Sequence, residues 1–152
     1  MTQAHDQIWS SALKALEIRM MSSKELLGKL TLKYPHEERE ILKVIEELKR
    51  VALLNDHRYT EDFVRYLLEK PIGRLKIEIE TRKRGLDSDL VDQILLELGY
   101  DERACGKKAL LEKDPQFQII EDPRRQKVKR VQYLRNRGFR DHTIYSLLRS
   151  DD

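Results

Sequence analysis

The sequence predicts an all-α protein made of stacked helical repeats. Apolar residues recur at the spacing of one helix face along most of the chain, and no stretch alternates as a strand does. Of the 152 residues, 38% are charged and 39% are hydrophobic, whereas an average globular domain has about 25% charged residues. Thin cores between many helices would expose such a large charged surface, so we expect an elongated body.

A short helix-turn pattern occurs three times. Its copies are the segments 25–30, 80–86 and 133–139, and aligning Glu25, Glu80 and Tyr133 gives steps of 55 and 53 residues. We interpret each copy as the end of a basic helix, which is followed by a second, more apolar helix. A period near 50 residues is typical of stacked supersecondary units. Such an array suits a long partner better than a small enclosed substrate.

Capping and breaking signals place the helices of the first half. Ser22 stands three residues before Glu25, which is the spacing of a capping box, so a helix begins there. That helix ends at Tyr34, because the residue before Pro35 is driven out of the α region. Apolar stripes predict further helices over 7–20 (Ile8, Ala12, Ala15, Leu16 and Ile18), 41–48 and 59–67.

Glycines and prolines punctuate the second half. Gly85 and Gly138 suit the left-handed conformation that ends many helices. Two Asp-Pro pairs, at Pro115 and Pro123, predict a linker over 112–123 that could act as a hinge. The predicted buried faces are Ile72, Leu75 and Ile79; Leu90, Val91, Ile94, Leu95 and Leu98; Ala104, Cys105, Ala109 and Leu110; Val128, Val131 and Leu134; and Ile144, Leu147 and Leu148.

These breaks divide the chain into an N-terminal helix (1–21), a first helical repeat (22–71), a second repeat (72–114) and a linker with the third repeat (115–152). Helices shorter than about 12–15 residues are marginal alone. Each repeat is therefore expected to bury its stripe against its neighbours, and a charge at Leu90 or Ile94 should destabilise the fold.

No catalytic, cofactor or metal constellation stands out, so we expect a protein that is not an enzyme. The histidines (His5, His36, His57 and His142) are scattered, and we expect them at the surface or in helix caps. Cys105 is the only cysteine and is expected to be buried and inert, which favours a reducing compartment. No apolar run reaches 18 residues and no signal peptide is visible, so we expect a cytoplasmic protein without a membrane partner.

Basic residues accumulate towards the C-terminus. Residues 1–72 have no net charge, residues 73–123 carry −3, and residues 124–152 carry +6. Basic helices at equivalent places in two repeats could line a groove that follows a phosphate backbone with little sequence preference. A solvated charged face is the alternative. The candidate binding residues are Arg74, Lys76, Arg82, Lys83, Arg84, Arg124, Arg125, Lys127, Lys129, Arg130, Arg135, Arg137 and Arg140.

The order and spacing of four motifs resemble those of the RecX family, bacterial regulatory proteins that modulate the RecA recombinase. The resemblance runs from about Ser11 to Leu148. Two features depart from the family pattern: Thr81 stands where leucine is usual, and Glu69-Lys70-Pro71 replaces an arginine and small polar residues. The matching motifs are Ser22–Leu26 with Lys29-Leu30; Asn55–Tyr59 with Phe63-Val64; Gly73, Ile77, Glu80 and Arg84–Leu86; and Tyr133-Leu134 with Arg137–Phe139.

This resemblance implies three tandem three-helix repeats, each like a helix-turn-helix unit, in an elongated curved array. It further implies a regulator that binds the RecA–DNA filament along its groove. An array with capped ends could be monomeric, and the lack of a cofactor motif predicts that no cofactor is bound. The partners of the regulator would be RecA and single- or double-stranded DNA. The expected effect is inhibition of filament extension, strand exchange, ATPase activity and the co-protease activity of the SOS response.

Two alternatives remain open at this point. One is a general nucleic-acid-binding protein of helix-turn-helix type that acts without RecA. The other is a helical scaffold for protein partners alone. Charge reversal at Arg130 and Arg137 is expected to separate a DNA reader, which would lose DNA binding, from a protein scaffold, which would keep its partner.

Overall fold

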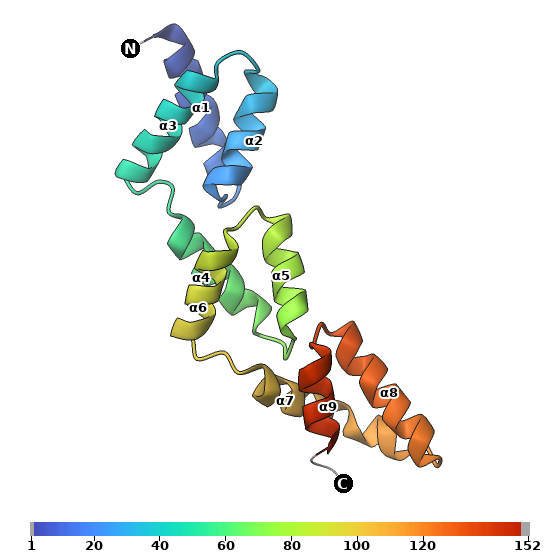
Figure 1. The fold of residues 1–152 in the computed structure, drawn as a ribbon. Helices are drawn as coiled ribbons and strands as arrows, with labels where there is room; N and C mark the ends of the chain where they lie inside the picture. The colour runs from blue at the N-terminus through green and yellow to red at the C-terminus, as the bar shows by residue number, and fades with distance from the viewer. Residues whose placement is uncertain (1, 150–152) are drawn as a thin grey trace. The chain divides into compact units, whose positions relative to one another are not determined.

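The computed structural model describes residues 2–149, and over that range the chain forms nine α-helices and no strand (Figure 1). The predicted all-α class is confirmed. The helices are α1 (Gln3–Ile18), α2 (Ser23–Lys33), α3 (Glu38–Arg50), α4 (Asp56–Leu67), α5 (Arg74–Lys83), α6 (Ser88–Glu97), α7 (Glu102–Gln118), α8 (Pro123–Asn136) and α9 (Asp141–Arg149).

Local capping chemistry sets several helix ends as predicted. The Ser22 hydroxyl accepts a hydrogen bond from the Glu25 N–H at 3.0 Å, and the Glu25 carboxylate accepts one from the Ser22 N–H at 3.2 Å. This is the expected capping box at the start of α2. Gly85 follows α5 with φ +67° and Gly138 follows α8 with φ +86°, so both helices end at left-handed glycines as predicted.

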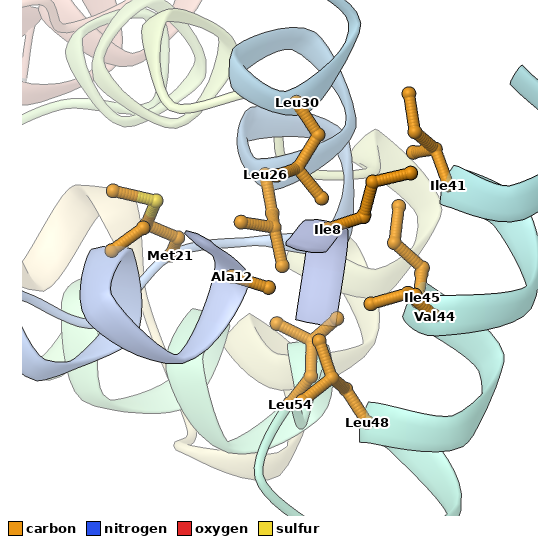
Figure 2. Packing of buried hydrophobic residues seen from close by; sticks show 11 residues of the cluster. Ile8, Ala12, Met21, Leu26, Leu30, Ile41, Val44, Ile45, Leu48 and Leu54 are labelled. Atoms are coloured by element: carbon orange, nitrogen blue, oxygen red, sulfur yellow. The ribbon is translucent and has the colours of Figure 1, made fainter. Parts of the chain in front are cut away.

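The helices α1, α2 and α3 share one apolar core (Figure 2). Ile8 and Ala12 of α1 are fully buried beside Leu26 of α2 and Val44 of α3. The helix α1 is thus one of three members of this group. The expected division into an N-terminal helix (1–21) and a separate repeat (22–71) cuts through this core, because the stripe of α1 is buried by both later helices.

The helices α7, α8 and α9 share a second core. Its buried residues are Ala109, Leu134, Phe139, Ile144, Leu147 and Leu148, with Cys105, Leu110, Val131 and Tyr133 partly buried against them. Burial raises the pKa of the Cys105 thiol, which keeps it protonated at neutral pH.

The linker predicted over 112–123 is wrong for most of its length, because α7 continues through Pro115 to Gln118. Two contacts with α8 hold this last stretch of α7. The buried Phe117 packs edge-on against the Tyr133 ring with centroids 5.7 Å apart, and Asp114 pairs with Arg130 at 3.0 Å. These contacts offset the backbone hydrogen bond that proline removes. Pro123, in turn, is the first residue of α8, a position that favours proline.

The buried face of α5 also differs from the prediction. Leu75 and Ile79 are exposed, whereas Ile77 and Thr81 are buried. Ile72 is buried but precedes α5. Leu75 and Ile79 lie on one face of α5, whereas Ile77 and Thr81 lie on another. Only one of these two faces can lie inward, and packing buries Ile77 and Thr81.

By compactness the described chain forms two units: unit 1 takes in residues 2–63 and 81–91, and unit 2 takes in 64–80 and 92–149. Each of α4, α5 and α6 contributes to both units. The predicted repeat boundaries at 72 and 115 stay a prediction. Within residues 2–149 no helix is long and apolar enough to cross a membrane.

Candidate nucleic-acid interface

Helix α8 carries a purely basic charge. Its sequence contains six lysine and arginine residues and no acidic residue. The side chains of Arg124, Arg125, Lys127 and Lys129 are exposed, and no ion pair joins them to the described residues. Four exposed cations on one helix, none of them paired with a carboxylate of the described residues, provide the electrostatic footprint that phosphate groups require.

The placement of the first two arginines opposes helix stability. Arg124 and Arg125 lie in the first turn of α8, where Asp122 caps the helix by accepting the Arg124 N–H at 3.0 Å. The partial positive charge at a helix N-terminus disfavours cations there by about 0.3–1 kcal/mol each. The Asp122 carboxylate offsets part of this repulsion, and an external anion would offset more.

The exposed face of α8 also presents two amides. Arg125, Lys129, Gln132 and Asn136 are spaced at i, i+4, i+7 and i+11, which places them on one stripe, and all four are exposed. Gln132 and Asn136 are not among the residues that the sequence predicted for binding. Their spacing relative to the two cations is the signal that could have found them.

Three other predicted cations of this region serve the fold. Arg130 donates to Asp114 at 3.0 Å and lies over the Phe117 ring. Arg137 donates to the carbonyl of Pro71 at 3.0 Å, while its guanidinium lies 5.5 Å from the Tyr133 ring centre. Arg135 pairs with Asp141 at 3.0 Å and remains half exposed.

Arg74 and Arg140 converge on one buried carboxylate, that of Glu102. Glu102 accepts hydrogen bonds from the Arg74 backbone N–H at 2.7 Å, from Arg140 Nε at 3.1 Å and from the Thr143 hydroxyl. Burial alone would raise the pKa of Glu102, but these three donors outweigh it and lower that pKa below its ordinary value. The Arg74 side chain is itself engaged by Glu78 and Asp92, so both arginines are structural cations of unit 2.

The cations of α5 and of the turn after it also differ in burial. Arg84 is half-buried in unit 1, where its guanidinium lies 4.8 Å from the Phe63 ring centre and donates to the Tyr59 hydroxyl at 3.2 Å. Arg82 and Lys83 are exposed, as is Lys76 near the start of the helix. Because Arg82, Lys83 and Arg84 belong to unit 1 and the other ten candidates to unit 2, a single groove lined by α5 and α8 stays a prediction.

No group of three histidine, cysteine or carboxylate side chains in residues 2–149 is arranged to hold a metal ion. His5, expected at the surface or in a helix cap, is buried near the start of α1, and its Nε2 lies 3.2 Å from the Glu47 carboxylate.

The fold and this basic helix define an all-α protein of helix-turn-helix type with a candidate phosphate-binding face. Residues 55–95 match the family model for the second three-helix domain of RecX. The chain is 37% identical to the regulatory protein RecX of Pelodictyon phaeoclathratiforme, over 91% of this chain and 84% of that protein. It is 34% identical to the regulatory protein RecX of Prosthecochloris aestuarii, over 90% and 88% of the two chains. The chain belongs to the RecX family of regulatory proteins.

The fold agrees with this assignment. The crystal structure of RecX from Lactobacillus salivarius superimposes with a TM-score of 0.80, covering 96% of this chain and 95% of that one at 23% identity. The matched residues 55–95 coincide closely with α4, α5 and α6. The predicted resemblance to the RecX family is therefore confirmed.

Proposed function

We propose that this protein binds the RecA–DNA filament and inhibits filament extension, strand exchange, ATPase activity and co-protease activity. Through these effects it regulates recombination, DNA repair and the SOS response in the cytoplasm, without catalysis of its own. Membership of a family of regulatory proteins supports this role. The observation that carries the DNA contact is the acid-free helix α8, with four exposed and unpaired cations.

Of the thirteen candidate cations, we assign DNA binding to Arg124, Arg125, Lys127 and Lys129, with Lys76, Arg82 and Lys83 as further exposed candidates. The cations held by carboxylates, carbonyls or aromatic rings in the fold are Arg74, Arg84, Arg130, Arg135, Arg137 and Arg140. A row of cations without base-specific partners binds phosphates at any sequence, and its affinity falls steeply with salt. Simultaneous contacts with DNA and with several filament subunits would add through multivalency.

The functional test is the ATPase activity of RecA on single-stranded DNA, with this protein added at substoichiometric amounts. We expect activity to fall when few molecules are present per filament. No effect up to equimolar protein, together with salt-sensitive binding to naked duplex DNA, would instead favour a general nucleic-acid-binding protein. No effect on the ATPase and no DNA binding would favour a scaffold for other protein partners.

The site test is the double variant Arg125→Glu with Lys129→Glu, both exposed on one stripe of α8. It replaces the charge reversal of Arg130 and Arg137, because those two side chains hold the fold through Asp114 and the Pro71 carbonyl. We expect weaker DNA binding and a salt dependence reduced by about one unit of log–log slope per lost phosphate contact.

The matched control is Lys43→Glu with Lys49→Glu on α3, where each lysine makes only a surface ion pair. This control should keep wild-type DNA binding. Equal loss in both double variants would mean that net charge alone governs binding, and loss in neither would remove α8 from the interface.

A further inference from the structure

A shallow groove lies between α1 and α2, and it shares no residue with the basic surface of α8. Helix α1 lines it with residues spaced at i, i+3, i+4 and i+7, and α2 lines it at i, i+1 and i+4. The lining residues are Ser11, Lys14, Ala15, Ile18, Lys29, Leu30 and Lys33. All of them belong to unit 1, so the groove is formed within one compact body.

The floor of this groove is apolar and its rims are cationic. Ala15 and Leu30 are buried and form the floor. Ile18 is 78% exposed on one edge, although the sequence pattern had placed it in the buried stripe of α1. The exposed Ile18 and the buried Leu30 line the same groove, so the apolar surface of the core continues to the groove edge.

The three lysines lie on both sides of this floor. Lys14 comes from α1, whereas Lys29 and Lys33 come from α2 one turn apart, and no acidic side chain is among the described residues that line the groove. Lys33 donates to the Ser11 hydroxyl at 3.1 Å, which holds its amine across the two helices. Ser11 is itself fixed by the Tyr34 hydroxyl at 2.7 Å. The Lys33 amine is therefore held in position in the absence of a partner.

The volume of the groove and its lining residues indicate which kind of partner it would bind. The hollow measures ≈ 180 Å³, below the roughly 300–1,000 Å³ of sites that enclose small molecules. It has room for a side chain of a larger partner. A nucleic acid is disfavoured because no aromatic ring lines the groove to stack on a base. An aliphatic side chain would cover Ile18 and the floor, while flanking carboxylates would meet the lysines.

We propose that the α1–α2 groove is a docking site for a short acidic segment of a partner protein that carries one aliphatic side chain. This site is additional to the DNA contact of α8. It supplies a protein-binding surface in the first three-helix group, and a partner could engage it whether or not DNA is bound elsewhere.

The test is an NMR titration of the ¹⁵N-labelled 152-residue chain with a synthetic acidic octapeptide that has one central leucine among aspartates and glutamates. We expect amide shifts confined to α1 and α2 near the groove. The same peptide with serine in place of leucine should bind more weakly, as should the double variant Lys14→Glu with Lys29→Glu, by about tenfold or more given the reversed rim charges. Both lysines are exposed, so this variant should keep its fold.

Two further variants separate the apolar and ionic parts of the proposal. Ile18→Ser should weaken binding of the leucine peptide and leave binding of the serine peptide unchanged. Lys49→Glu, the same charge change on α3, should alter binding of neither peptide.

Amide shifts outside α1 and α2, or equal binding of the peptides by all variants, would overturn the proposal. Tighter groove binding of oligothymidylate than of the peptide would show a nucleic-acid site instead. RecA ATPase assays on the Lys14 and Lys29 variant test the proposed function separately.

Discussion

The backbone N–H of Gly73 donates a hydrogen bond to the carbonyl oxygen of Arg137, with an N···O distance of 2.9 Å. The Leu75 N–H makes an equivalent bond of 2.9 Å to the Gly138 carbonyl. The turn between α8 and α9 therefore satisfies N–H groups at the start of α5, which would otherwise lack intrahelical partners. Helix capping here comes from a turn 64 residues later in the chain.

The turn after α5 has the same design. Its Arg84-Gly85 pair corresponds to Arg137-Gly138, with each glycine left-handed and each arginine placed over an aromatic ring. The Arg84 carbonyl accepts from the Ser22 hydroxyl at 3.0 Å, at the start of α2. Each Arg-Gly turn thus offers its arginine carbonyl to the start of an earlier helix.

Gly73→Ala should destabilise the protein, because the added Cβ would overlap the backbone of Gly138 and Phe139. Backbone at this distance cannot give way as a flexible side chain would. We expect the free energy of unfolding to fall by at least the roughly 1–3 kcal/mol typical of overpacking. Urea denaturation followed by circular dichroism measures the loss, and an unchanged midpoint would contradict the close approach.

Gly28→Ala should have the opposite effect. Gly28 lies within α2, is exposed, and has no atom within 4 Å of the position of an added Cβ. Alanine restricts the unfolded chain and favours the helix, so we expect a gain of about 0.5–1 kcal/mol. The same urea titration checks this, and a loss of stability would show that the first copy of the repeat requires glycine for packing.

Glu102→Gln should make stability less dependent on pH. The folded state lowers the pKa of Glu102 from its ordinary value of 4.5, so its ionised form contributes stability that is fully present above that value. The contribution disappears as pH falls through the folded pKa. We expect the variant to be less stable at pH 7 by about 1–3 kcal/mol, with a smaller difference at pH 3. Urea midpoints from pH 3 to 7 test this.

Glu121→Gln is the control for that experiment, since Glu121 is exposed in the segment between α7 and α8. It should follow the wild-type pH profile. If the deficit of Glu102→Gln stayed constant from pH 7 to pH 3, the carboxylate charge would not be what stabilises the junction.

Ile94→Lys should lower stability by several times more than Leu96→Lys. Both residues lie on α6, but Ile94 is fully buried and Leu96 is 83% exposed. A buried lysine loses apolar burial and leaves a charge without a partner, so we expect a loss of a few kcal/mol, whereas a surface change usually stays within about 0.5 kcal/mol. Thermal melts that rank the two variants equally would contradict the assigned face of α6.

The proposed DNA-binding face of α8 illustrates how far sequence reasoning reaches. Charge counting correctly located the basic region that contains α8, because net charge requires no coordinates. It could not separate Lys129, which is exposed, from Arg130, which is held by Asp114. Those two cations are adjacent in sequence and differ only in the direction of their side chains, which the packing of α7 on α8 decides.

By itself the sequence determined the all-α class, the capping box of Ser22 and Glu25, and the left-handed ends at Gly85 and Gly138. These features depend on residues within about one helical turn of each other, so they are encoded locally. Tertiary structure alone decided that α7 continues through Pro115 and that α5 buries Ile77. It also decided that a turn after α8 caps the start of α5. Each of these depends on contacts between residues far apart in the chain, whose energies outweigh the local preferences that the sequence displays.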